Sequence, residues 1–432
     1  MIGYIIDFIG LLLVVRYANK NVEKAVKFLI IICFFQNFIL CIFSPYMTKE
    51  SFSLFIILKE LFVLLYITIR LIKNNFVIKK FQLFCCFSVF LLIILAFLGG
   101  DGLIKTRLSC MRQLYLPFVF YLFGSLSDVS VVEIKRIVKF YISLCIITTL
   151  FGFVENSMGS ELWENLNIVS YCENKGIIST EGFYNGLPGN FYSFDIPFLL
   201  HAQRMASFFL DPVICGQVLS FAFVASFFGK SIILSDLKRY MYSFILGIGI
   251  CMTLCKGGMI IAMFSFCILV GKIFEKKIIS NIMLLIGAGV VFLYISFSLT
   301  NELSTATHMN GLVSGIQSMF ENPFGMGIGS AGNLSVEEGK NINIIGAESY
   351  VGSMLAQIGI IGLMINMYYF VYIKNIVDKI EVDRNIRAII AVPSFALALT
   401  SLVNFTAISF TSCFIFIILI SMLNSTKENG MV

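Results

Sequence analysis

Charged residues are scarce in this sequence, and their scarcity decides the class of protein. Only 13% of the 432 residues are charged, about half of the share found in soluble domains. The hydrophobic share is 58%, and apolar stretches close to the ~20 residues that cross a bilayer recur along the chain. The composition excludes a soluble globular domain and predicts an all-α, polytopic integral membrane protein.

The residues that serve several common chemistries are also few. The two histidines, His201 and His308, do not lie among other metal-ligand residues, so we expect no metal site and no metal cofactor. The glycine-rich stretch NPFGMGIGS, residues 322–330, lacks the Gly-Lys-Ser/Thr ending of an ATP-binding loop. Most of the 12 cysteines lie in apolar stretches, and only Cys110 and Cys172 are expected to be exposed.

The apolar stretches predict about 12–13 transmembrane helices in a single membrane domain, residues 1–432. The predicted spans are 1–15, 25–44, 52–71, 81–98, 114–125, 138–155, 212–229, 240–255, 258–273, 278–297, 349–372, 388–404 and 406–422. Most lysines and arginines fall in one set of alternating loops, which the positive-inside rule places in the cytoplasm. This puts the N-terminus outside and the C-terminus inside. The net charge of +6 follows largely from this bias and indicates no nucleic-acid partner.

Two loops on the predicted outer side, 156–205 and 298–348, are long, and long structured loops are usually functional. Each contains apolar residues at helical spacing: Leu162, Trp163, Leu166 and Val169 in the first, and Met309, Leu312, Ile316 and Met319 in the second. These stripes predict an amphipathic helix in each loop, lying in the outer interface. Such a helix either caps the bundle or lines a substrate site.

A minority of basic residues lies on the predicted outer side, against the general bias. Arg107, Arg112 and Arg204 precede spans, and Lys256 lies in a short hairpin between two spans. These four predict a cationic pocket at the outer lipid–water boundary, suited to a lipid-linked phosphate or pyrophosphate. The alternative is that each side chain only anchors the chain to headgroups. The glycines of 322–330 likewise form either a plain turn or a turn that exposes N–H groups to a ligand.

Four stretches resemble, in the same order, the motifs of the O-antigen polymerase and O-antigen ligase superfamily. They are RMASFFLDPVICGQVLSFAF from Arg204, TLCKGGMIIA from Thr253, ENPFGMGIGSAG from Glu321 and AESYVGSMLAQIGIIGLMI from Ala347. The resemblance implies a bacterial membrane glycosyltransferase that uses polyprenyl-pyrophosphate-linked glycans at the outer face, without metal or nucleotide. Lys256 stands where that family usually has Arg, and Glu348 stands where the ligase branch usually has His. The second departure favours the polymerase branch.

The resemblance therefore implies a repeat-unit polymerase for O-antigen, capsule or exopolysaccharide. Arg204 and Lys256 would neutralise the departing pyrophosphate, and Glu348, with His308 as the second candidate, would act as general base. The further substrate-binding residues expected are Arg107, Arg112, Asp211, Asn322, Gly325 and Gly327.

The expected partners are the polyprenyl-pyrophosphate-linked oligosaccharide, membrane lipid, and a flippase and a chain-length regulator of the same pathway. The expected location is the bacterial cytoplasmic membrane. Three alternatives stay open: a glycan ligase, a flippase or transporter that needs no base, and an assembly protein for which the outer arginines are dispensable.

Overall fold

The computed structural model describes residues 21–99, 103–176, 183–194, 201–273, 303–335, 345–346, 348–379 and 384–426, and the single positions 282, 285 and 289. The chain, which the sequence treats as one membrane domain, divides by its internal contacts into two compact units. Unit 1 comprises residues 1–77 and 126–259, and unit 2 comprises residues 78–125 and 260–432. Each unit is described by itself.

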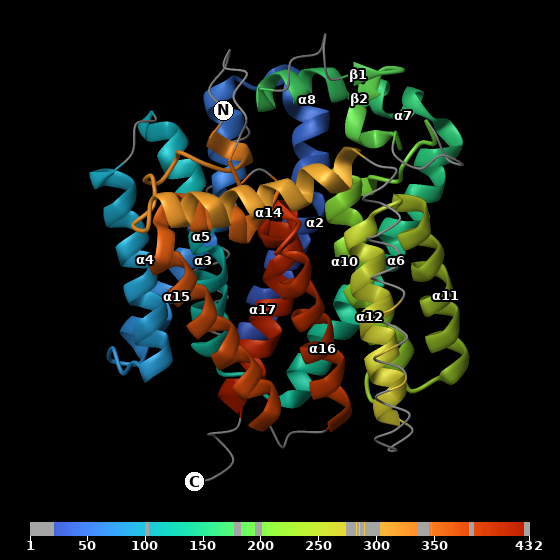
Figure 1. Cartoon of the computed structure of the whole chain (residues 1–432). Coiled ribbons are helices and arrows are strands. Elements are labelled where there is room, and N and C mark those ends of the chain that lie inside the picture. The colour runs from blue at the N-terminus through green and yellow to red at the C-terminus, as the bar shows by residue number, and fades with distance from the viewer. Residues whose placement is uncertain are drawn as a thin grey trace. The chain divides into compact units, whose positions relative to one another are not determined.

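Unit 1 is built from helices joined by one long irregular segment (Figure 1). Its main helices are α2 (Val22–Phe43), α3 (Lys49–Lys73), α6 (Val131–Met158), α10 (Pro212–Phe228), α11 (Asp236–Thr253) and the start of α12 (Lys256–Ile273). The irregular segment carries α7 (Ser160–Asn165), α8 (Ile168–Lys175), the two-stranded sheet β1 (Phe183–Tyr184) and β2 (Leu187–Pro188), and the 3₁₀ turns η2 (Gly189–Phe191) and η4 (Ser207–Phe209). A further 3₁₀ turn, η1 (Ser44–Tyr46), follows α2.

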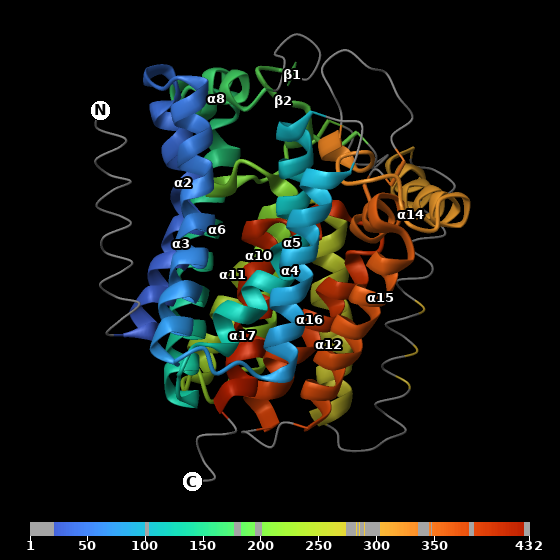
Figure 2. The ribbon, with the colours of Figure 1, turned by 90° about the vertical axis from the view of Figure 1, so that its left-hand side faces the viewer.

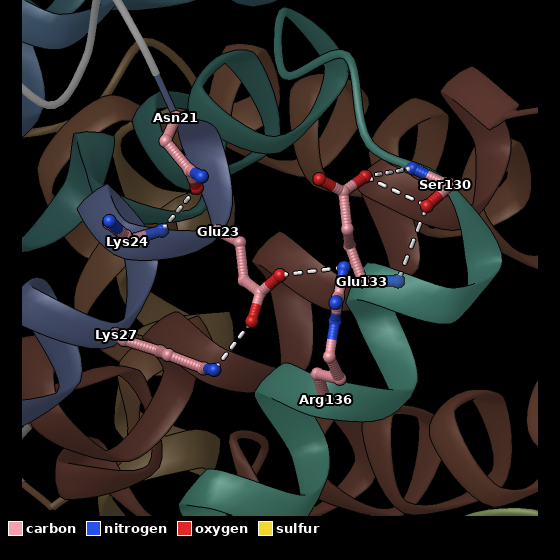
Figure 3. Close-up of polar contacts among 7 residues, drawn as sticks. All are labelled: Asn21, Glu23, Lys24, Lys27, Ser130, Glu133 and Arg136. Atoms are coloured by element: carbon pink, nitrogen blue, oxygen red, sulfur yellow. Dashed lines mark hydrogen bonds and ion pairs between the residues drawn. The ribbon is translucent and has the colours of Figure 1, made fainter.

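The two ends of unit 1 are fixed by local sequence. At one end Ser130 caps α6 in a capping box with Glu133, and Asn21 caps α2 through the N–H of Lys24 (Figure 3). At the other end α8 lies beside α2 (Figure 2). There α8 also contacts η1, and the Asn174 side chain donates to Ser44 O at 2.9 Å. The segments that share each end are therefore those that the loop charges assign to the same side of a membrane.

Unit 2 consists of α4 (Lys80–Leu98), α5 (Ile104–Ser125), the continuation of α12, α14 (Leu303–Glu321), α15 (Tyr350–Lys379), α16 (Arg384–Thr400) and α17 (Phe410–Ser425). The 3₁₀ turns η5 (Asn333–Ser335) and η6 (Phe405–Ile408) also belong to it. Helix α14 runs across the direction of α15 (Figure 1). On α4, the exposed side chains Leu83, Phe87, Phe90 and Phe97 follow one helical face, which is typical of contact with lipid.

The protein is an all-α, polytopic membrane protein. Among the described residues, 5 helical segments are long and apolar enough to cross a membrane: Val22–Tyr46, Lys49–Lys73, Lys80–Leu98, Val131–Met158 and Tyr350–Tyr372. Shorter apolar helices cover Pro212–Phe228, Lys256–Val270, Ile386–Thr400 and Phe410–Ser425.

Each predicted span within the described residues coincides with a helix, although α5 begins ten residues before the predicted 114–125. The predicted spans 1–15 and 278–297 lie outside the described residues, apart from positions 282, 285 and 289.

The helices expected in the long loops exist, but their packing differs from the prediction. In the first loop Asn167 adopts a left-handed φ of 66°, which breaks the expected helix into α7 and α8. Trp163 is buried inside unit 1 rather than lying at an interface. In the second loop α14 packs through small residues: a Cβ on Gly315 would lie 2.3 Å from Gly352 O of α15. Ile316, on the predicted apolar stripe, is exposed instead.

The expected exposure of Cys110 and Cys172 is wrong, because the fold buries both side chains. Burial raises the pKa of the Cys172 thiol to about 11. The thiol is therefore protonated at neutral pH and a poor nucleophile. All 12 cysteines are free thiols.

Candidate functional site

Arg204 lies in unit 1, in the extended segment before η4, and its guanidinium binds main-chain carbonyl groups. Nε donates to Thr253 O at 3.0 Å and one Nη donates to Asn190 O at 3.2 Å. The other Nη lies 3.5 Å from Leu254 O. Thr253 ends α11, so the cation faces the negative end of the helix dipole. This arrangement fixes Arg204 between α11 and the segment at η2.

Lys256 opens α12 directly after this helix end, in a hairpin that packs closely against α10. A Cβ on Gly258 would lie 2.6 Å from Gly216 O, and a Cβ on Gly216 would lie 2.4 Å from the Cβ of Cys255. The two glycines therefore bring the starts of α10 and α12 together. The N-terminus of a helix carries partial positive charge, and Lys256 adds a full one.

Asp211, expected among the substrate-binding residues, has a structural role at the start of a helix. It is the N-cap of α10, where its Oδ1 accepts from the N–H groups of Val213 and Ile214, and Pro212 follows at the first helical position. Asp211 and Arg204 both lie within electrostatic reach of Cys255 in the hairpin. Unit 1 thus gathers Arg204, Lys256 and Asp211 around one hairpin. We call this region the Arg204 end of unit 1.

Glu155, which is not among the residues predicted from the sequence, is the most heavily bonded side chain at this end. It is 0% exposed. Its carboxylate accepts from Trp163 Nε1 at 3.0 Å, from Ala206 N at 3.1 Å and from Ser207 N at 2.7 Å. One signal was available: a carboxylate in the last turn of an apolar helix opposes the helix dipole. Such a residue needs tertiary partners.

Two neighbours of these residues hold buried polar atoms without hydrogen-bond partners. They are Asn156 Oδ1, next to Glu155, and Gln203 Nε2, next to Arg204. Buried polar atoms are nearly always bonded to protein or to an ordered molecule.

Glu348 lies in unit 2, in the turn before α15, and its backbone is strained. It adopts a φ of 63°, which is costly for a residue with a Cβ. Its N–H donates to Asn333 Oδ1 at 3.0 Å, and its carbonyl accepts from Phe405 N at 3.0 Å. The surroundings therefore hold the backbone of Glu348 in place from both sides. Strain maintained in this way is frequent at functional sites.

The structure brings Glu348 and His308, the two predicted base residues, together. His308 Nδ1 lies 3.4 Å from Glu348 Oε2 and 3.3 Å from Glu348 O. Both oxygens accept hydrogen bonds at neutral pH, so this geometry favours the tautomer with hydrogen on Nδ1. Nε2 then carries a lone pair. The two side chains are 28% and 38% exposed, which leaves the pair accessible to a ligand.

The glycine-rich loop does not present its N–H groups to a ligand, contrary to one of the two readings of its sequence. Met326 N and Gly327 N donate to main-chain carbonyls of Ala356 and Gln357, and Gly329 N donates to the Gln357 side chain. Gly325 N donates within the turn, to Asn322 O.

The physical reason is a break in α15 at Gly359, whose φ of 56° is not helical. The loop docks into this break, where Pro323 O accepts from Ile360 N at 2.8 Å. Asn322 itself is exposed at the start of the loop. The loop therefore serves as a tight turn that holds α15.

Arg107 and Arg112 both lie on α5 in unit 2. One Nη of Arg107 lies 3.4 Å from Ala96 O and from Gly99 O, at the end of α4. Arg107 also packs on the glycine-rich loop, since a Cβ on Gly329 would lie 2.8 Å from its Cγ. Arg112 is half-buried on the same helix. The predicted residues thus form one group in unit 1 and another in unit 2.

Comparisons of this chain with protein-family models, with curated proteins and with solved structures found no match. Among the described residues there is no group of three or more His, Cys, Asp or Glu side chains that would hold a metal ion.

Proposed function

We propose that this protein is a membrane glycosyltransferase that polymerises polyprenyl-pyrophosphate-linked oligosaccharide repeat units at the outer face of a bacterial cytoplasmic membrane. The observation that carries the proposal is the pairing of His308 with Glu348 on a strained, doubly anchored backbone. The ordered resemblance of four sequence motifs and the cationic Arg204 end of unit 1 support it. A flippase would need the cations but not the base.

The proposed reaction joins two lipid-linked glycans. A sugar hydroxyl of one glycan attacks the anomeric carbon of the other, and a new glycosidic C–O bond forms. The bond between the anomeric carbon and the pyrophosphate oxygen breaks, and the bond pair leaves with the polyprenyl pyrophosphate. The hydroxyl proton passes to the base. Since the leaving group already carries its charge well, the protein has mainly to hold and neutralise it.

The geometry supports different roles for the two members of the pair. His308, with hydrogen on Nδ1, would accept the proton at Nε2, and Glu348 would fix the ring and its tautomer. This reverses the order of preference that the sequence gives, in which Glu348 is the first candidate. An imidazole oriented by a carboxylate is a common general base. Arg204 and Lys256 would contact the pyrophosphate.

The function is tested with purified protein in vesicles and polyprenyl-pyrophosphate-linked repeat units extracted from the same cells. We expect a ladder of glycan chains on the lipid together with released polyprenyl pyrophosphate. Transfer of a glycan to a different lipid acceptor without a ladder would indicate a ligase. Movement of the substrate across the bilayer without any covalent product would indicate a flippase. Either of these two outcomes would reject the polymerase.

The base is tested by comparing two variants with a control on the same helix. His308→Gln should lower kcat by about 100-fold or more, within the range typical of general-base removal. Glu348→Gln should lower it less, because the Glu348 carbonyl still accepts from Nδ1. Gln317→Asn, an exposed change on α14, should leave kcat unchanged. Near-normal polymer from His308→Gln would remove it from the chemistry.

A further inference from the structure

The segment that carries Arg204 is held through four consecutive main-chain N–H groups. Those of Arg204 and Met205 donate to main-chain carbonyls of unit 1, at 2.7 Å and 2.9 Å. Those of Ala206 and Ser207 donate to the side chain of Glu155, with the Ser207 bond at 2.7 Å. Two of these four main-chain bonds therefore depend on one carboxylate.

The environment of Glu155 accepts a carboxylate and no close substitute. All three of its partners, the two amides and the Trp163 indole, are donors. A glutamine has the same shape, but its NH₂ group would face N–H groups, and one buried donor would lose its acceptor. The position in the last turn of α6 opposes the helix dipole. Glu155 therefore stabilises the segment that it binds and does not stabilise its own helix.

The segment also needs to be held, because its backbone is strained. Ser207 has a φ of 48° and Leu210 has a φ of 53°. Left-handed conformations of residues with a Cβ persist only where the surroundings impose them. Here the surroundings are Glu155 and the bond from the Ser207 hydroxyl to Thr148 O at 2.8 Å.

We infer that Glu155 is a positioning residue, which holds residues 206–207 on α6 and thereby sets the position of the Arg204 guanidinium. Glu155 is fully buried, so it acts on the substrate only through Arg204. The inference rests on the proposed function in assigning Arg204 to the pyrophosphate. The attachment of the segment to Glu155 does not depend on that function.

The attachment is tested by fluorescence, because Trp163 is the only tryptophan of the chain and bonds to Glu155. Glu155→Gln should shift the Trp163 emission to longer wavelength and increase its quenching by acrylamide. The control Glu161→Gln changes an exposed carboxylate of α7 and should do neither. An emission spectrum that Glu155→Gln leaves unchanged would overturn the inference.

The positioning role is tested by kinetics on the same protein samples. A misplacement of about 1 Å at a reacting group lowers the rate by about 100-fold. We therefore expect Glu155→Gln to lower kcat and kcat/KM together by a factor of that order. A lower yield of folded protein with an unchanged kcat per folded molecule would show a purely structural residue, and would reject the positioning role.

Rescue by a second substitution separates positioning from loss of folding. Ser207→Gly removes the cost of the left-handed φ at that residue together with its hydroxyl bond to Thr148 O, so Ser207→Gly alone is measured alongside as the reference. Glu155→Gln combined with Ser207→Gly should recover at least tenfold in kcat over Glu155→Gln alone. If Glu155→Gln alone does not fold, the double variant takes its place in the fluorescence and kinetic assays. No recovery would contradict the role of strain. Should the wild type form no polymer, the proposed function fails, and the Trp163 emission still decides the attachment.

Discussion

The two ends of helix α6 make two different kinds of polar contact. At its start Arg136 pairs with Glu23 at 3.0 Å, and the arginine side chain is 57% exposed (Figure 3). Lys27 pairs with the same carboxylate. At its other end Glu155 is fully buried and binds main-chain N–H groups and an indole. We call the first region the Glu23 end of unit 1.

The contrast separates an ion pair with one solvated partner, Arg136, beside a Glu23 side chain that is only 11% exposed, from a fully buried carboxylate that organises the backbone. Exposed ion pairs contribute little to stability, because water and salt compete with them. A buried carboxylate with several donors is costly to remove, because each donor is left without an acceptor. The Arg204 end therefore has the rigidity that a site requires, whereas the Glu23 end tolerates substitution.

Arg204 should give the largest effect at the rigid end. Arg204→Ala removes the contacts to Thr253 O and Asn190 O and should lower the polymerisation rate by about 100-fold or more. Arg204→Lys should recover little of it, since an ammonium lacks the planar fork of the guanidinium. The rate is measured on purified, quantified protein. Normal chain length from Arg204→Ala at wild-type protein level would reject its role.

Lys256 should give the next largest loss of activity. The test is whether activity depends on a positive charge at this position. Lys256→Arg keeps the positive charge at the start of α12 and should keep most of the activity. Lys256→Met should lower kcat and kcat/KM together by about tenfold or more, as expected for a contact formed mainly in the transition state. Full turnover in Lys256→Met, with only a lower yield, would show that the residue anchors the chain to headgroups.

Two glycines allow the same comparison for main-chain contacts that carry no charge. Gly325 of unit 2 and Gly176 of unit 1 both have left-handed φ values, 82° and 85°. A Cβ on Gly325 would lie 2.3 Å from Gln357 O, whereas one on Gly176 would meet nothing within 4 Å. Gly176→Ala should cost about 1 kcal/mol of unfolding free energy from backbone strain alone. Gly325→Ala should cost about 3 kcal/mol, because overpacking adds to it. Thermal unfolding in detergent measures the free-energy loss of each variant. Equal losses would show that the glycine-rich loop shifts to accommodate the added Cβ.

The positions of the helices could be read from the sequence, because a bilayer imposes long apolar runs. The packing faces could not. The apolar stripe of α14 pointed to Ile316, but the helix packs through Gly311 and Gly315. Without a hydrophobic force between helices in lipid, small residues that allow close approach decide the contact. Small residues spaced along a helix form no apolar stripe, so this contact could not be predicted from hydrophobic periodicity.

The candidate site was predictable in its residue types and not in its contacts. His308 and Glu348 were both candidates, and their pairing spans 40 positions of sequence. Glu155 meets Ser207 across 52 positions, so only the fold reveals the bond. The sequence could not decide between a plain turn and a turn that exposes N–H groups, because the break at Gly359 lies in another segment and leaves no mark on the loop itself.

The smallest loss of stability is expected at the Glu23 end. The comparison of the two ends of α6 predicts that this loss is small. Arg136→Gln removes one partner of Glu23 but leaves Lys27 in place. The arginine is largely solvated, so the loss should be about 0.2–1 kcal/mol of unfolding free energy. It should shrink further as salt screens the pair, and the polymerisation rate should not change. The measurement is thermal unfolding of wild type and variant at low and high salt. A loss of several kcal/mol, or one that salt leaves unchanged, would mean that the Glu23 end is organised like the Arg204 end, and that burial, not location along α6, decides which charges matter.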